Sequence, residues 1–113
     1  SFASKKPVLT DSLPADPDLQ NLDFHMLKVS LKKLKGIRKM AGLGFCSKAK
    51  EQFSQLVYSE RLKIHYAYSW SQGRIAQCFG HNIKAKALYE QALQLEPAYP
   101  WEKNEIDEQI ESM

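Results

Sequence analysis

Residues 73–97 read GRIAQCFGHNIKAKALYEQALQLEP, and their pattern decides the fold. Small residues, one aromatic residue, large apolar residues and a final proline follow one another in this order: Gly73, Gly80, Ala85, Tyr89, Ala92, Leu93, Leu95 and Pro97. From Ala85 to Leu95, apolar residues recur every three or four positions, which is typical of one face of an α-helix. The stretch therefore predicts two helices that meet at Gly80, the second of which ends at Pro97.

An earlier part of the chain repeats this pattern at an interval of 36 positions. Gly44 corresponds to Gly80, and Phe53 corresponds to Tyr89. The further pairs are Lys48 and Lys84, Ala49 and Ala85, Lys50 and Lys86, Gln55 and Gln91, and Val57 and Leu93. Internal similarity at such an interval is typical of stacked helical repeats, in which each unit buries its apolar face against its neighbours. Arrays of this kind usually bind other molecules rather than catalyse reactions.

The second copy resembles a tetratricopeptide (TPR) repeat, and the resemblance extends over residues 24–99. In that family, two antiparallel helices of a unit of about 34 residues pack through small residues, an aromatic side chain fills the joint, and proline ends the second helix. The first copy is more degenerate, because Leu56 stands where the second copy has Ala92 and no proline follows it. The resemblance implies an all-α fold in which antiparallel helix pairs stack as a short superhelix.

A chain of 113 residues suits one small domain. We expect residues 1–18, which hold three prolines and little periodic apolar content, to form an extended arm. A TPR-like helical domain is expected over residues 19–113. Within it, we expect repeat one at about 24–58, repeat two at about 59–97 and a capping helix at about 100–113.

The helix boundaries are predicted from residues that are common at helix starts. The predicted starting residues are Asp16 or Asp18, Ser47, Ser59, Asn82 and Pro100. Gly42 and Gly44 end the first helix, and the third helix is predicted over residues 62–79. Because neither glycine nor proline occurs from Ser47 to Gln72, one continuous helix over that range is the alternative.

The number of repeats bears on function. Two helix pairs and a closing helix fall short of the three or more units that usually stabilise a free-standing array. We therefore expect an exposed apolar end that is covered by a partner, by a second copy of the chain or by further repeats.

Charge is distributed unevenly although the net charge is only +3. Residues 24–50 hold eight lysines and arginines and no acid, whereas the last helix is acidic. These faces could simply be solvated, could attract an acidic peptide or a phosphate backbone, or could favour head-to-tail stacking of copies. RNA binding is disfavoured, because Arg38 and Arg74 recur at the repeat interval while their neighbours do not, and because the isoelectric point of about 8.8 is moderate.

The resemblance also implies where a ligand would lie. In the TPR family the first helix of each pair lines a concave groove that holds peptides or partner helices. The matching residues here are Leu34, Lys35, Arg38, Trp70, Arg74 and Gln77, with Lys28 on the rim beside Lys35. An exposed Trp70 beside Arg74 would suit a binding hot spot, and the alternative is that Trp70 fills the joint between helices. Some TPR proteins hold the acidic tails of chaperones with a clamp of lysine, asparagine and arginine. This chain has Trp70 and Arg74 where such a clamp would need lysine and asparagine.

Other classes of site are disfavoured by the distribution of reactive residues. The two cysteines, Cys46 and Cys78, are expected to be small buried helix residues, since they are too few for a disulfide framework. Cys78 and His81 lack the second pair of ligands that structural zinc needs. The three histidines lie in separate segments without a partner nucleophile or acid. We therefore expect no metal, no cofactor and no enzyme, in an intracellular soluble protein without a membrane span.

These observations predict a non-catalytic protein–protein interaction module, an adaptor or assembly factor, that binds a peptide or helix of another protein in a groove. An acidic partner and self-association stay open. The alternatives are a structural subunit of a larger complex and a basic helical-repeat RNA-binding protein.

Overall fold

The computed structural model describes the backbone of residues 17–113 and the side chains of residues 22–113. The described part contains six helices and no strand, which confirms the all-α class. The helices are α1 (Pro17–Gly42), α2 (Cys46–Ser54), α3 (Glu60–Lys63), α4 (Tyr66–Cys78), α5 (Asn82–Gln94) and α6 (Pro100–Glu111). The arm predicted over residues 1–18 lies outside the described residues except for Pro17 and Asp18, which belong to α1.

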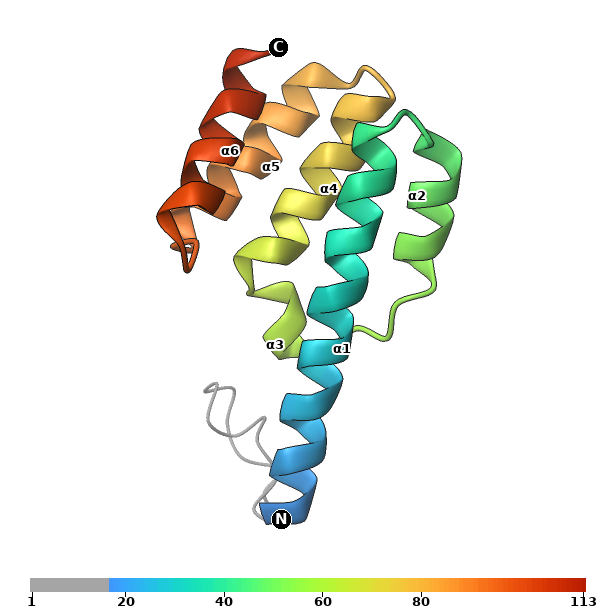
Figure 1. Ribbon diagram of the computed structural model, residues 1–113, viewed down its shortest axis with the longest axis vertical. Coiled ribbons are helices and arrows are strands. Elements are labelled where there is room, and N and C mark those ends of the chain that lie inside the picture. Colours follow the sequence, from blue (N-terminus) through green and yellow to red (C-terminus); the bar gives the residue numbers. More distant parts are fainter. Residues whose placement is uncertain (1–16) are drawn as a thin grey trace.

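Consecutive long helices run in opposite directions (Figure 1). α1 contacts α2 and α4, α4 contacts α5, and α5 contacts α6. The arrangement is therefore two helix pairs, α1 with α2 and α4 with α5, followed by a single helix. In consequence α1, α4 and α6 run in the same direction.

The ends of α1 and α4 share one hydrogen-bonding geometry, 36 positions apart. Gly44 and Gly80 have φ of +92° and +81°, a left-handed conformation that glycine adopts without a steric penalty. The next residue then donates its N–H back into the helix, from Phe45 to the Met40 carbonyl and from His81 to the Ala76 carbonyl. The duplication in the sequence thus reappears as a duplicated helix end.

Two predicted N-caps are wrong for the same reason. After each left-handed glycine only one residue precedes the next helix, so Phe45 and His81 are the N-caps and neither makes a side-chain capping bond. Ser47 and Asn82 already lie within the first turns of α2 and α5. Asp16, a predicted start of α1, lies outside the described residues, and Asp18 lies inside the helix.

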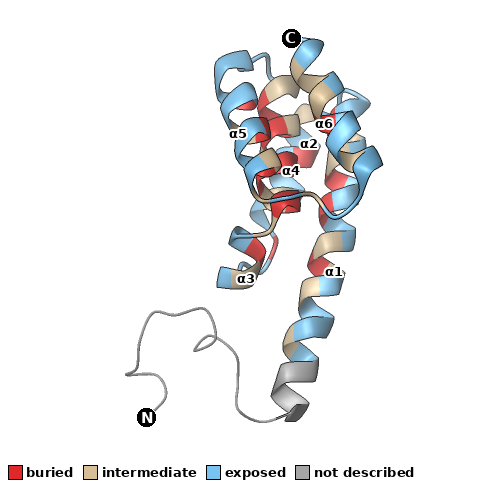
Figure 2. Cartoon of the chain, turned by 90° about the vertical axis from the view of Figure 1, so that its left-hand side faces the viewer, coloured by how far each residue is buried: buried red, intermediate tan, exposed pale blue. Residues whose placement is uncertain are grey.

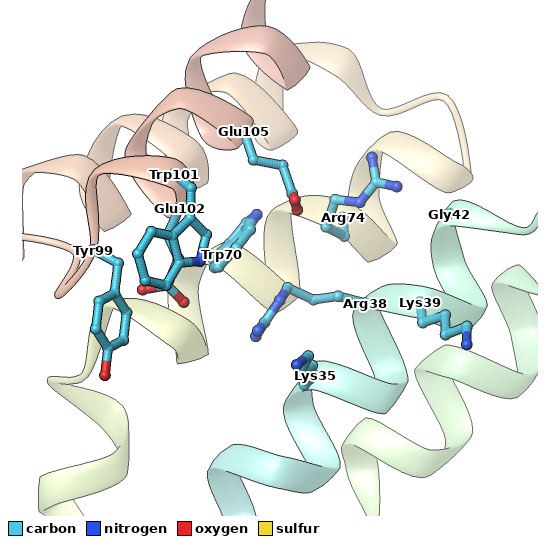
Figure 3. A pocket seen from close by; sticks show the side chains of 10 residues that line it. All are labelled: Lys35, Arg38, Lys39, Gly42, Trp70, Arg74, Tyr99, Trp101, Glu102 and Glu105. Carbon is cyan, nitrogen blue, oxygen red and sulfur yellow. The ribbon is translucent and has the colours of Figure 1, made fainter.

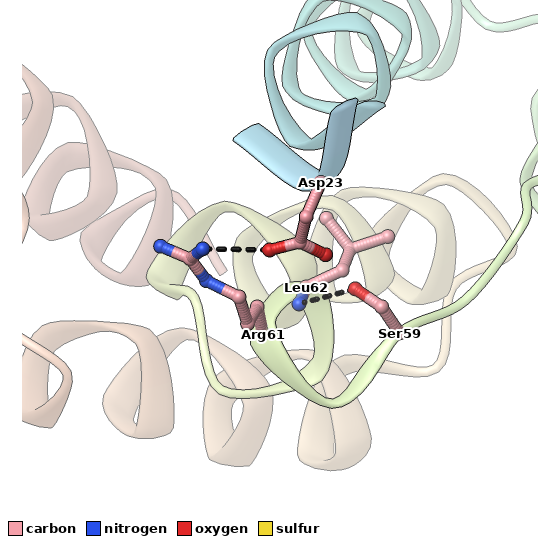
Figure 4. A network of polar contacts seen from close by, with 4 residues as sticks. All are labelled: Asp23, Ser59, Arg61 and Leu62. Atoms are coloured by element: carbon pink, nitrogen blue, oxygen red, sulfur yellow. Dashed lines mark hydrogen bonds and ion pairs between the residues drawn. The ribbon is translucent and has the colours of Figure 1, made fainter. Parts of the chain in front are cut away.

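The third predicted helix is interrupted, and the alternative continuous helix over residues 47–72 is wrong. Ser59 caps the short α3 as predicted, by accepting a hydrogen bond from the Leu62 N–H, and α3 is joined to α1 by an ion pair of 2.7 Å between Arg61 and Asp23 (Figure 4). At His65 the backbone is extended, and the Nδ1 atom of His65 accepts a hydrogen bond from the Ala67 N–H at 3.1 Å. This second cap starts α4 in a new direction.

The core follows the two helix pairs, and α4 is its most buried element (Figure 2). Tyr89 of α5 is 0% exposed and lies against Gly73 of α4. Its counterpart in the first copy, Phe53, is only partly buried and packs against Tyr58 and Tyr68. Fully buried alanines, Ala49 and its repeat equivalent Ala85, keep the helices close in both pairs. α6 adds Ile106 to the core and begins at Pro100, as predicted.

The prediction for the cysteines is wrong. Cys46, which begins α2, and Cys78, which ends α4, are joined by a disulfide with a Cα–Cα distance of 5.5 Å. Both side chains are only partly buried. The bond forms because the α1–α2 and α4–α5 turns lie at the same end of the molecule (Figure 1).

Large exposed apolar side chains occur at several places on the chain, and one group of them lies on α1. Leu22, Phe24 and Met26 are exposed on the N-terminal section of α1, and Val57 is exposed beside them in a cavity shared with Leu22 and Met26. In the described chain, α2 exposes no large apolar side chain and α6 exposes only Trp101. No helix among the described residues is long and apolar enough to cross a membrane.

Candidate functional site

A groove opens between the C-terminal half of α1, the middle of α4 and the start of α6 (Figure 3). Its cavity has a volume of about 420 Å³. The lining residues are Lys35, Arg38, Lys39 and Gly42 from α1, Trp70 and Arg74 from α4, and Tyr99, Trp101, Glu102 and Glu105 from the start of α6 and the residue before it. The three helices that run in the same direction thus all contribute to the lining of the groove.

The structure brings four of the six predicted site residues together in this groove: Lys35, Arg38, Trp70 and Arg74. Leu34 is not a groove residue, because it is 0% exposed in the core between the helix pairs. Gln77 does not line the cavity either, since its side chain accepts a hydrogen bond from the Tyr89 hydroxyl and donates one to Ser112. Lys28 also lies away from the lining.

Trp70 is the floor of the groove rather than an exposed hot spot. It is only 3% exposed, so the alternative of a joint-filling residue describes it better. Its Nε1 atom donates a hydrogen bond of 2.8 Å to Gln109 of α6, which fastens the capping helix to α4. The guanidinium carbon of Arg38 lies 4.0 Å from the centroid of its ring. Trp70 therefore positions a cation instead of presenting a free apolar surface.

Arg38 is held in place by two contacts. Besides stacking on Trp70, its Nη1 atom donates a hydrogen bond of 2.9 Å to the buried hydroxyl of Ser71. Burial lowers the pKa of Arg38 to about 10, although Glu102 and Glu105 act in the opposite direction. The side chain is therefore still a cation at neutral pH, with little freedom to lose when a ligand binds.

Arg74 lies across the end of α1. Its Nη1 atom donates a hydrogen bond of 3.3 Å to Gln77. A Cβ atom at Gly42 would come within 2.5 Å of the Nη2 atom of Arg74, so the lack of a side chain at Gly42 lets the guanidinium approach α1. Figure 3 shows Arg74 and Arg38 on the walls that face Glu105 and Trp101.

The α6 wall has the opposite charge. The Tyr66 hydroxyl donates a hydrogen bond to Glu102, and burial together with this carboxylate raises the pKa of Tyr66 to about 12. Glu105 accepts a hydrogen bond of 3.3 Å from Gln109. Within the described residues the one ion pair is Arg61 with Asp23, so the cations and carboxylates of the groove face each other without direct pairing.

Tyr99 and Trp101 form a stacked aromatic pair at the edge of the groove. Their ring centroids are 4.3 Å apart and the ring planes differ by 14°. Tyr99 is 51% exposed and Trp101 is 64% exposed, so most of this aromatic surface faces solvent. The sequence contained a signal for this pair, because two aromatic residues flank the proline that starts α6, but both lie beyond the end of repeat two.

No group of three His, Cys, Asp or Glu residues in residues 22–113 is arranged to hold a metal ion. The chain matches no protein-family model, no curated protein and no solved structure.

Proposed function

We propose that this chain is a non-catalytic protein-interaction module, built as a short TPR-like array, and that its groove binds a segment of a partner protein that carries acidic side chains. The observation that carries the proposal is the wall of Lys35, Arg38 and Arg74, a set of cations that no carboxylate of the described residues pairs with directly.

Two properties of this wall favour an acidic peptide. Arg38 is fixed by Trp70 and Ser71 before any ligand arrives, so its guanidinium can donate hydrogen bonds without first losing conformational freedom. Arginine donates in a planar fork that matches a carboxylate, and both arginines lie in a concave site where water can be displaced. Lys35 is exposed at the rim and adds long-range attraction.

The proposal is tested by selecting peptides from a random phage-displayed library on the immobilised protein, and then by measuring their affinities by fluorescence polarisation. Selected peptides should be rich in aspartate and glutamate. Arg74→Ala should weaken their binding by about 1–4 kcal/mol, because it removes a partly buried charge from the contact. Affinity should also fall as salt rises.

A matched control is Lys48→Ala, which removes an exposed cation from α2 outside the groove. It should leave peptide affinity unchanged within error. If no peptide is selected, or if Arg74→Ala and Lys48→Ala bind the selected peptides as tightly as the unmodified protein, the groove is not the binding site and the proposal fails.

A further inference from the structure

The stacked pair of Tyr99 and Trp101 is not explained by core packing. Each ring covers one face of the other, and more than half of both side chains remains in solvent. Single exposed apolar residues are ordinary, but two parallel rings at the edge of a cavity form a rigid aromatic surface. Such a surface suits a flat or cationic group.

Negative charge lies next to this aromatic surface. Glu102 follows Trp101 directly in the chain, and the two side chains line the same cavity as Tyr99 (Figure 3). Glu105, one helical turn further on, lines it too. An aromatic face together with a carboxylate attracts a guanidinium by two mechanisms, the ring quadrupole and a charge-assisted hydrogen bond.

The same combination already holds an arginine elsewhere in the molecule. The guanidinium carbon of Arg61 lies 4.2 Å from the ring centroid of Phe24, and its Nη1 atom lies 2.7 Å from Asp23, the neighbour of Phe24 in the chain. Trp101 and Glu102 are likewise an adjacent aromatic and acidic residue. In the described residues no lysine or arginine lies over the Tyr99 or Trp101 ring.

We propose that Tyr99, Trp101 and Glu102 form a subsite for an arginine side chain of the bound partner. The inference rests on the proposed function, since it places this arginine in the segment that the groove binds. The subsite also fixes the orientation of the bound segment in the groove, because the acidic side chains of that segment would face α1 and α4 while its arginine faces the start of α6. The partner segment then carries both charges, rather than acidic residues alone.

The test uses the peptides selected on the unmodified protein. They should contain an arginine in addition to acidic residues, and replacing that arginine by glutamine should weaken binding by about 3- to 30-fold. In Trp101→Leu, which keeps an apolar side chain but removes the ring, the same replacement should have less than half this effect on the logarithm of affinity. Phe45→Leu is the matched control, because Phe45 is an exposed aromatic residue outside the groove.

The outcomes separate the two proposals. If acidic peptides bind in an Arg74-dependent way but contain no preferred arginine, the groove function stands and the arginine subsite is wrong. The subsite is equally wrong if replacing the peptide arginine has the same effect in Trp101→Leu as in the unmodified protein. If no groove-dependent peptide is found, both proposals fall.

Discussion

The ring of Tyr89 lies directly against the backbone of Gly73, so that a Cβ atom added at Gly73 would come within 2.6 Å of two ring carbons. Tyr89 is completely buried, and its hydroxyl donates a hydrogen bond to Gln77 on the same helix as Gly73. The contact joins α4 to α5 and sets their separation. The absence of one side chain in α4 is thus what lets the aromatic residue fill the second helix pair.

Gly73→Ala should therefore destabilise the protein although alanine favours helices. The methyl group would force the rigid ring of Tyr89 or the helix backbone to move, which typically costs about 1–3 kcal/mol. Urea unfolding followed by circular dichroism measures the change. The matched control is Gly36→Ala in α1, because a Cβ atom at Gly36 would meet nothing within 4 Å. This substitution should stabilise the protein by about 0.5–1 kcal/mol. Equal effects at the two glycines would contradict the packing described for Tyr89.

Trp70→Ala should lower the free energy of unfolding by about 3–5 kcal/mol, since it leaves a cavity under Arg38 and removes the hydrogen bond to Gln109. Trp101→Ala in α6 should change it by less than about 0.5 kcal/mol, because that side chain is mostly exposed. Thermal or urea unfolding of both variants distinguishes the floor of the groove from its edge. A small loss for Trp70→Ala would mean that the ring is not the core residue that the structure describes.

Sequence periodicity anticipated features that depend on neighbours along the chain. Gly44 and Gly80 were predicted as helix ends because a left-handed glycine leaves a local signal. The resemblance to a TPR repeat implied that an aromatic residue at the position of Tyr89 fills the joint, and Tyr89 is fully buried there. The predictions failed where distant segments meet. The disulfide of Cys46 with Cys78 depends on two turns that lie at the same end of the molecule, and no local pattern reveals it.

Only part of the groove lining was predicted, for the same reason. Lys35, Arg38, Trp70 and Arg74 lie on α1 and α4, which the duplication relates to each other. The facing wall comes from α6, which has no counterpart in the duplicated stretch. Leu34 was misplaced because successive residues of a helix face different directions, and the periodicity did not specify which of them faces the second helix pair.

The cap of α4 should make stability depend on pH. His65 can accept the Ala67 N–H only while its Nδ1 atom carries no proton, and burial lowers the pKa of His65 below 6.5, with Glu102 opposing this and Arg38 reinforcing it. Because the folded state takes up the proton at lower pH than the unfolded state, stability should be complete above about pH 6.5. It should decline as the pH falls from there toward the lower folded pKa.

Urea unfolding at a series of pH values from about 7.5 to 5 measures this dependence. His65→Asn is the informative variant, because asparagine caps helices well and does not titrate in this range. It should flatten the curve, whereas His65→Ala should flatten it and also lower stability at neutral pH by about 1 kcal/mol. A curve for His65→Asn as steep as that of the unmodified protein would assign the effect to other groups.

Reduction of the disulfide should lower stability without abolishing the fold. Cys46 and Cys78 are separated by 32 positions, and a cross-link over such a loop typically contributes about 2–4 kcal/mol by restricting the unfolded chain. Neither cysteine is among the fully buried core residues such as Tyr89 and Ile106, although Cys78 packs against the core from its partly buried position. The midpoint of urea unfolding should therefore fall when dithiothreitol is added, while the helical circular dichroism signal in the absence of urea stays nearly constant.

The double variant Cys46→Ser with Cys78→Ser supplies the control for this effect. Without reductant it should match the reduced protein in stability, and reductant should not change it further, because it has no bond left to break. Thiol titration under denaturing conditions should find no free thiol in the unreduced protein, in which both cysteines are paired. Because such bonds persist mainly in oxidising compartments, two reactive thiols in protein isolated from its native source under alkylating conditions would show that the bond does not form there.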